Sequence, residues 1–133
     1  MMYFLDTNTC IYFLKGTYPS VLSALRSKRP KDIKIPSIVK AELLLGAEKS
    51  QRKRENLIVC EKFLEPFEVI SFDDDASIVY SKIRAALEKK GTVIGPNDMI
   101  IAATVCSRKG ILVTNNTREF KRVPHLSCEN WTV

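Results

Sequence analysis

The sequence predicts a single α/β domain with a parallel β-sheet of four to five strands flanked by helices. Two observations indicate this class. Short segments with strand character alternate with longer helical segments along the chain, which is the order of βαβ units. Residues 111–113 form a continuous apolar run, Ile-Leu-Val, as expected for a strand that is covered on both faces. The 133 residues suit one domain and contain no repeat or linker, so residues 1–133 are expected to fold together.

The amino-terminal elements follow from local signals. Residues 3–5 are expected to form a short buried strand, and a helix over residues 7–14 begins directly after Asp6. A second helix opens at Pro19 and ends before Pro30, because a proline pushes the preceding residue out of helical geometry. Residues 33–35 alternate in polarity and are expected to form the next strand.

The middle of the chain contains an apolar helix followed by a basic one. Ser37 is expected to cap a helix that runs to about Lys49 and is apolar nearly all round, so this helix is expected to be buried. A basic helix over residues 51–64 is ended by Pro66, and residues 67–70 supply a further strand.

Two more helices precede the central strand at residues 111–113. Three aspartates, residues 73–75, are expected to cap the first and to complement its dipole until Gly91 ends it. Its expected apolar stripe consists of Ile78, Ile83, Ala86 and Leu87. The second, over residues 96–108, is apolar on most sides, and Gly110 ends it.

Charge indicates a polyanionic partner. The net charge is +6 and the pI is near 9.2, and clustered Lys and Arg gain affinity by releasing counterions from phosphates. Solvated helix faces are the alternative explanation for each basic cluster. The three clusters are Arg26, Lys28, Arg29 and Lys31; Lys49, Arg52, Lys53 and Arg54; and Arg118, Lys121 and Arg122.

Cysteine spacing and hydropathy exclude several classes. The four cysteines show no C-x-x-C spacing and only one histidine accompanies them, so reduced, buried thiols are expected rather than a zinc site. No basic leader precedes a long apolar run, and no apolar stretch approaches the roughly 20 residues of a membrane span. We therefore expect a cytoplasmic protein without membrane contact.

Polar residues follow two of the predicted strands and mark a candidate site. Asp6-Thr7-Asn8 and Thr114-Asn115-Asn116 come directly after strands, and ligands of parallel sheets bind beyond the carboxyl ends of the strands. Asp6 taken alone also fits a helix cap.

Two further acids belong to apolar helices. Glu42 is flanked at helical spacing by Ile38 and Leu45, so it needs a metal, a basic partner such as Lys40 or Lys49, or a raised pKa. Asp98 lies in the first turn of its helix, where capping is the alternative role. Three such carboxylates without a neighbouring histidine are typical of sites for magnesium or manganese.

Four segments give the chain a resemblance to PIN-domain nucleases, specifically to VapC toxins of toxin-antitoxin pairs. The resemblance covers it nearly end to end. In order, the segments are YFLDTNTCIYFL, SIVKAELLLGA, GPNDMIIAATV and LVTNNTREFKRVPHLSCENW.

The resemblance implies a metal site. In it, Asp6 and Asp98 are direct ligands of Mg²⁺, for which Mn²⁺ can substitute, and Glu42 is a further acid. Thr7, Asn8, Thr114 and Asn115 support the site. Many family members carry a fourth acid where this chain has Asn116. Either Asn116 orients a ligand or Glu119 takes the acid's role, and the number of metal ions stays open.

The resemblance also implies the activity and the partners. It points to an endoribonuclease toxin that inhibits translation by cutting initiator tRNA in its anticodon stem-loop, with a VapB-type antitoxin as partner and a second copy of the chain as a dimer. A metal-activated water leaves a 5′-phosphate and a 3′-hydroxyl. A single histidine, His125, cannot supply the two-imidazole pair of metal-independent ribonucleases.

Two other functions compete with this one. A phosphoacceptor signalling domain also places acids at strand ends, but it needs an acidic pair after the first strand, where this chain has Thr7 and Asn8 after Asp6. A catalytically inactive PIN-like module that binds RNA or a partner is the second alternative, suggested by the missing acid at Asn116.

Overall fold

The computed structural model describes residues 1–133 and contains one five-stranded sheet. Its strand order is β3-β2-β1-β4-β5, and all four neighbouring pairs are parallel. The strands are β1 (Tyr3–Leu5), β2 (Ile33–Pro36), β3 (Glu68–Ile70), β4 (Ile111–Val113) and β5 (Ser127–Glu129). The predicted α/β class and the parallel sheet are confirmed.

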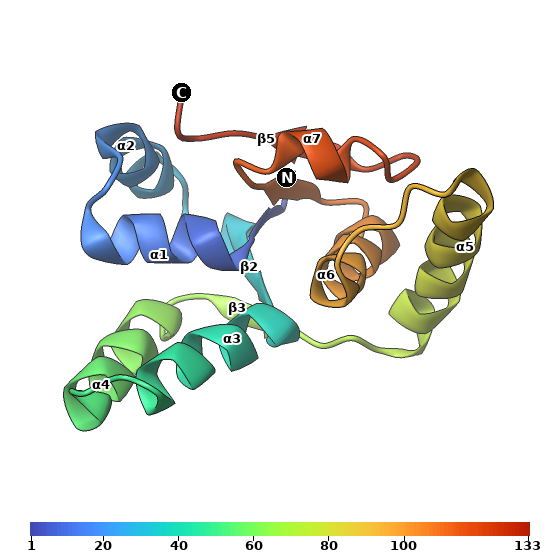
Figure 1. Cartoon of the computed structure of the whole chain (residues 1–133). Helices are drawn as coiled ribbons and strands as arrows, with labels where there is room; N and C mark the ends of the chain where they lie inside the picture. Colours follow the sequence, from blue (N-terminus) through green and yellow to red (C-terminus); the bar gives the residue numbers. More distant parts are fainter.

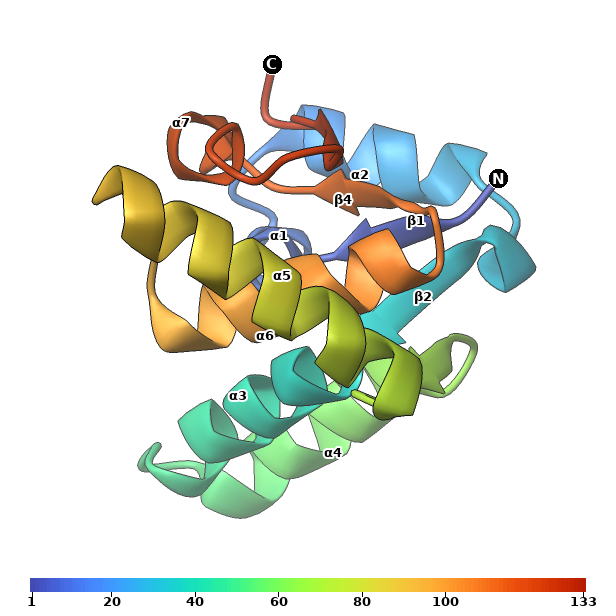
Figure 2. The same cartoon turned by 90° about the vertical axis from the view of Figure 1, so that its right-hand side faces the viewer.

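Helices connect successive strands and cover the sheet. They are α1 (Thr7–Lys15), α2 (Pro19–Ser27), α3 (Ser37–Glu48), α4 (Lys53–Leu64), α5 (Asp74–Lys90), α6 (Pro96–Ser107) and α7 (Thr117–Phe120), with one 3₁₀ turn at Pro30–Asp32. Helices α1 and α2 lie on one side of the sheet and α5 and α6 on the other (Figures 1 and 2). Helices α3 and α4 pack together beyond them, next to β3 (Figure 1). None of the helices is long and apolar enough to span a bilayer.

The hydrophobic core lies between the central strands and α6. Side chains of β1, β2 and β4 on both faces of the sheet are buried, as the continuous apolar run in β4 predicts. Helix α6 buries Met99 and all of residues 101–105, which confirms that it is apolar on most sides. Fully buried strand residues are Phe4, Leu5, Ile33, Ile35, Leu112 and Val113.

Helix ends agree with the sequence signals at several points. The Asp6 carboxylate accepts a hydrogen bond from the Thr9 N–H at 2.8 Å and so caps α1. Asp73 caps α5 in the same way, through the Ala76 N–H at 3.0 Å. Gly91 ends α5 in the left-handed region, with φ of 67°, which a residue without Cβ adopts at little cost.

The expectations for α3 and α5 are partly wrong. Ser37 is the first helical residue rather than the cap, which is Pro36 and makes no side-chain bond. Helix α3 is not buried all round, since Leu45 is 57% exposed. On α5, Ile78 is 56% exposed, and the buried stripe instead contains Ala76, Ile83 and Leu87.

The carboxyl-terminal segment adds the edge strand β5, and Trp131 packs this segment against β1. Trp131 is buried and its ring lies 5.9 Å from that of Tyr3 in β1. The Lys28 ammonium lies 4.9 Å from the centre of the Tyr3 ring and 5.8 Å from that of Trp131. All four cysteines are free thiols: Cys10 and Cys60 are buried, and Cys106 and Cys128 are half-buried.

Candidate active site

The site lies where β1 and β4 end side by side. Leu5 pairs with Val113 in the parallel register, so Asp6 and Thr114, the next residues of each strand, are brought together. The Asp6 N–H donates to the Val113 carbonyl at 3.1 Å and the Thr9 hydroxyl to the same carbonyl at 3.2 Å. The rigid strand ends thus fix the first residue of the site.

Asp6 is the most enclosed acid of the site, with 6% of its surface exposed. Burial raises the pKa of this carboxyl, and the negative charge of Glu42 adds to the rise. Hydrogen bonds from the Thr114 hydroxyl and from Thr9 act in the opposite direction and lower its pKa. Asp6 is therefore both the helix cap and a buried carboxylate that faces another acid.

Glu42 projects from α3 toward the starts of α1 and α6. Its Oε1 accepts from the Thr7 hydroxyl at 2.6 Å, and its Oε2 accepts from the Asn97 amide at 3.3 Å. No Lys or Arg forms an ion pair with it. The structure therefore rules out the basic partner, Lys40 or Lys49, that the sequence left open.

Asp98 is the most perturbed acid of the site. Its pKa is raised to about 6, chiefly by burial and then by the charges of Asp6, Glu119 and Glu42. Gly95 is the N-cap of α6 and no side chain caps this helix, so capping does not explain Asp98. A carboxylate that three other acids destabilise needs a compensating positive charge at neutral pH.

Glu119 completes a group of four acids. It lies in α7, and its Oε2 accepts from the Asn116 amide at 3.1 Å. The Asn116 N–H in turn donates to the Thr114 hydroxyl at 3.0 Å. The structure thus brings Glu119 beside Asp98 and gives Asn116 the position of a group that holds Glu119. Asn8 and Asn115 are exposed, and neither side chain takes part in a hydrogen bond of this site.

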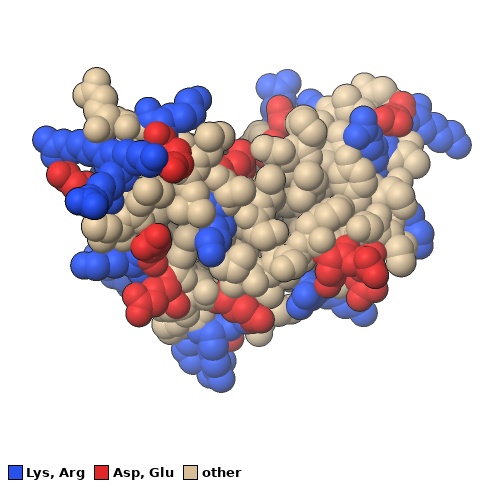
Figure 3. All heavy atoms as spheres, turned by 90° about the horizontal axis from the view of Figure 1, so that it is seen from below, with Lys and Arg blue, Asp and Glu red and all other residues tan.

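The residues present suit a hard divalent cation. All the side chains that could bind a cation offer oxygen atoms, and no basic side chain neutralises them. Burial, and then their negative charges, raise the pKa of Asp98. No three His, Cys, Asp or Glu side chains lie close enough to enclose an ion directly, so water would complete the coordination, as it commonly does for Mg²⁺. A notch holding acidic side chains separates the half with α3 and α4 from the half with α5 and α6 (Figure 3).

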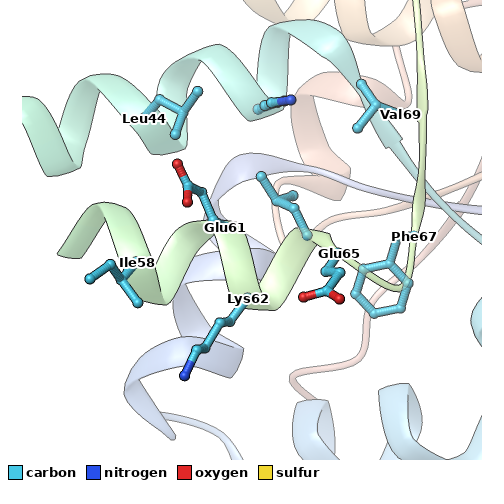
Figure 4. Close-up of a pocket in the computed structure, with 9 residues that line it drawn as sticks. Leu44, Ile58, Glu61, Lys62, Glu65, Phe67 and Val69 are labelled. Carbon is cyan, nitrogen blue, oxygen red and sulfur yellow. The ribbon is translucent and has the colours of Figure 1, made fainter. Parts of the chain in front are cut away.

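Of three hollows on the surface, two contain none of the four acids. One, of about 680 Å³, lies between α3, α4 and β3, and its lining residues include Leu44, Ile58 and Phe67 (Figure 4). A second hollow of about 440 Å³ has Glu42 on its rim. His125 is exposed and lines a third hollow with Val79 and Cys106, away from the acids.

Comparison with known proteins decides the family. The family described as "PIN domain" matches residues 3–126. "Ribonuclease VapC2" of Rickettsia felis is 41% identical over 132 residues, covering 98% of each chain. "tRNA(fMet)-specific endonuclease VapC" of Salmonella typhimurium is 41% identical over 131 residues, also covering 98% of each. The chain belongs to the PIN-domain family of VapC ribonucleases.

Solved structures agree with this VapC assignment. VapBC from Salmonella typhimurium, crystallised with DNA, matches with a TM-score of 0.93 at 40% identity and 98% coverage of both chains. VapBC2 from Rickettsia felis, bound to a DNA fragment from its promoter, matches with a TM-score of 0.92 at 40% identity, covering 98% of this chain and 99% of that one. The resemblance inferred from the four sequence segments is confirmed.

Sequence reasoning missed one polar residue of this VapC-family site. Asn97 reaches Glu42 from α6, although the sequence marks it only as the neighbour of Asp98. Asn97 is exposed and far from Glu42 in the sequence, so no pattern other than its place beside Asp98 could have predicted the contact.

Proposed function

We propose that this chain is a metal-dependent endoribonuclease and the toxin of a toxin-antitoxin pair. The observation that carries the proposal is the group of four carboxylates that includes Asp98, whose pKa the charges of the other three help to raise. This group stands in a chain 41% identical to proteins named as ribonucleases. A cluster of uncompensated acids favours cation-assisted chemistry over the phosphoacceptor alternative, because Asp98 and Glu42 lie on helices.

The proposed ligands are Asp6 and Asp98, with Glu42 as a further acid and Glu119 as the fourth. A divalent cation, Mg²⁺ or Mn²⁺, would lower the pKa of a water molecule and place a positive charge against the scissile phosphate. The rest of the chain orients the acids: Thr9 and Thr114 hold Asp6, Thr7 holds Glu42, and Asn116 holds Glu119.

Water as nucleophile predicts products with a 5′-phosphate and a 3′-hydroxyl. A metal-independent route through a 2′,3′-cyclic phosphate needs two positioned acid-base groups, typically imidazoles. His125 is the only histidine and lies beside α5 and α6, away from the four acids. End-group analysis of the cleaved RNA therefore separates the two routes.

The proposed substrate is tRNA, with initiator tRNA and its anticodon stem-loop as the first candidate. Two relatives, from Salmonella typhimurium and Shigella flexneri, are named tRNA(fMet)-specific endonucleases. Single-stranded loops with splayed bases are the usual targets of sequence-specific RNA recognition. Arg118 and Lys121 flank Glu119 on and after α7 and are exposed, so basic side chains stand beside the acids.

A VapB-type antitoxin and a second copy of the chain are the proposed protein partners. The matching structures from Rickettsia felis and Salmonella typhimurium are VapBC assemblies. A homodimer would have about twice the mass of the 15.1 kDa chain in light scattering of the purified protein.

The test is cleavage of total RNA and of initiator tRNA by the purified chain, with the 5′ ends of the products sequenced. We expect cutting with Mn²⁺ or Mg²⁺, none with EDTA, and losses of at least about 100-fold for Asp98→Asn and Glu119→Gln. Glu65→Gln, which removes an exposed acid directly after α4 and outside the site, is the matched control and should cut normally.

Cleavage in EDTA, or full activity of Asp98→Asn, would refute the mechanism. RNA binding without any cleavage, in wild type and variants alike, would favour the inactive PIN-like module instead. Expression in a bacterial host tests the toxin role separately: growth should stop with the wild type and continue with Asp98→Asn.

A further inference from the structure

Two neutral donors hold the Glu42 carboxylate, one on each oxygen. Thr7 Oγ1 donates to Oε1 at 2.6 Å and Asn97 Nδ2 donates to Oε2 at 3.3 Å. The donors belong to different helices, because Thr7 is the first residue of α1 and Asn97 is the second of α6. With one donor on each oxygen, rotation of the carboxylate breaks at least one bond, so its orientation is fixed.

The neutrality of these donors matters for the site. A Lys or Arg in the same place would hold the carboxylate equally well but would cancel its charge. Glu42 has no such partner. A hydroxyl and an amide therefore orient the group while its negative charge stays available to a cation.

The Asn97 side chain has no evident structural task. Asn97 is exposed, its amide makes only this hydrogen bond, and no side chain caps α6. It directly precedes Asp98 in the first turn of the helix. The bond to Glu42 therefore ties the turn that carries Asp98 to the middle of α3, and with it the relative placement of the two acids.

We infer that Asn97 is a positioning residue for RNA cleavage, which acts through Glu42 together with Thr7 and touches neither RNA nor cation. The inference rests on the proposed ribonuclease activity. Groups that orient ligands from behind change activity or metal affinity by about 10- to 100-fold when they are removed. Because the Asn97 bond is long and exposed, we expect the lower end of that range.

The first test compares single variants in steady-state cleavage of RNA with saturating Mn²⁺. Asn97→Ala should lower kcat roughly tenfold and leave KM for RNA unchanged. Asn97→Gln, which keeps the amide donor, should retain more activity than Ala. Asn97→Asp should retain less, because it removes the donor and places a negative charge against Oε2. The control is Asn56→Ala, which removes a 2.8 Å amide bond to Ser50 outside the site and should cut normally.

The second test is a double-mutant cycle with Glu42→Gln, measured under single-turnover conditions. If Asn97 acts through Glu42, adding Asn97→Ala to Glu42→Gln should cause no further loss. Where Glu42→Gln leaves no measurable cleavage, the same cycle is measured as Mn²⁺ affinity by calorimetry, with Asn97→Ala weakening binding only in the wild-type background.

The outcomes separate this inference from the proposed function. An inactive wild type, or an active Asp98→Asn variant, refutes the ribonuclease proposal itself. With those two results as expected, three outcomes overturn the role of Asn97: normal kcat in Asn97→Ala, a raised KM alone, or an equal effect of Asn97→Ala in both backgrounds.

Discussion

At the scale of single residues, Gly110 lies closely against the core residue Phe4. A Cβ built there would overlap the ring of Phe4, with Cδ1 at 2.6 Å, and the ring is fully buried and cannot move aside. Gly110→Ala should therefore lower the free energy of unfolding by about 1–3 kcal/mol, the cost of overpacking. Urea denaturation measures the change.

Gly46 is the matched control for Gly110. It lies in α3, is exposed, and nothing stands within 4 Å of the place of its Cβ. Gly46→Ala should raise the free energy of unfolding by about 0.5–1 kcal/mol, because alanine favours the helix. Equal effects at the two positions would contradict the packing described around Phe4.

The raised pKa of Asp98 predicts that the stability of the metal-free fold depends on pH. Its pKa is about 6 in the fold and about 4 in the unfolded chain. Between these values the folded state binds more protons, so stability falls as pH rises from about 4 to 6. Above pH 6 the charged Asp98 destabilises the metal-free fold, by about 1–2 kcal/mol after allowance for solvent screening.

Replacement of Asp98 by asparagine should remove that cost. Without metal, Asp98→Asn is expected to melt higher than the wild type at pH 7.5 and equally at pH 4, as measured by circular dichroism. Asp74→Asn, which removes an exposed acid from the first turn of α5, is the control and should not gain stability with pH. A constant difference between Asp98→Asn and wild type at all pH values would contradict the raised pKa.

At the scale of elements, the α1 cap and the proposed active site share one residue, Asp6. Asp6→Ala removes both the cap and the buried carboxylate, so loss of activity in that variant is ambiguous. Asp6→Asn keeps an oxygen acceptor for the Thr9 N–H. We expect it to stay within about 0.5 kcal/mol of wild-type stability and to lose cleavage.

The α5 cap provides the complementary control. Asp73→Ala removes an equivalent bond, to the Ala76 N–H at 3.0 Å, and should cost about 1 kcal/mol of stability. Its cleavage rate should be normal, because Asp73 is not among the four acids. Thermal melts paired with cleavage rates separate stability from activity. Normal cleavage by Asp6→Asn would remove Asp6 from the proposed site.

Elements with strong local signals were predicted well from the sequence, and those set by tertiary context were not. Buried strands such as β4 and the capped start of α5 have apolar runs or aspartates that act locally. The exposure of Leu45 depends on what packs against α3, because an all-apolar helix gives no periodicity that marks its outer face. No strand was predicted over Ser127–Glu129, which forms β5, since its Ser-Cys-Glu sequence has little strand propensity.

The candidate site also divides into residues with a local sequence signal and residues placed by tertiary structure. Asp6, Glu42 and Asp98 could be proposed from the sequence because each carboxylate conflicts with, or opens, an apolar element. Glu119 could only be named as an alternative to Asn116, because the turn that brings α7 beside Asp98 leaves no pattern in the sequence.

At the scale of the whole molecule, a chain with net positive charge carries an acidic site. The chain has 21 Lys and Arg against 15 Asp and Glu, yet four of its acids meet at one edge of the sheet. Binding of RNA to the uncut Asp6→Asn variant should therefore weaken by orders of magnitude between about 50 and 200 mM salt.

Single substitutions locate the basic residues that contact RNA. Arg118→Ala and Lys121→Ala should each reduce the slope of log affinity against log salt by about one, because each removes one phosphate contact. Arg84→Ala is the control, since Arg84 is already paired with Glu88 at 2.9 Å. A salt response that none of these variants changes would place the RNA on another face.

The same concentration of acids makes the fold as a whole sensitive to divalent cations. Because repulsion among the four carboxylates opposes folding, an ion bound between them should raise the melting temperature of the metal-free protein at pH 7.5. At 100 times its dissociation constant, Mn²⁺ should add about 2.7 kcal/mol, a shift on the order of 10 °C.

At pH 5 the shift should be smaller, because protons compete for Asp98, whose pKa is about 6. EDTA should reverse the shift and Asp98→Asn should reduce it. An equal shift at both pH values, or in wild type and variant alike, would mean that Mn²⁺ binds elsewhere.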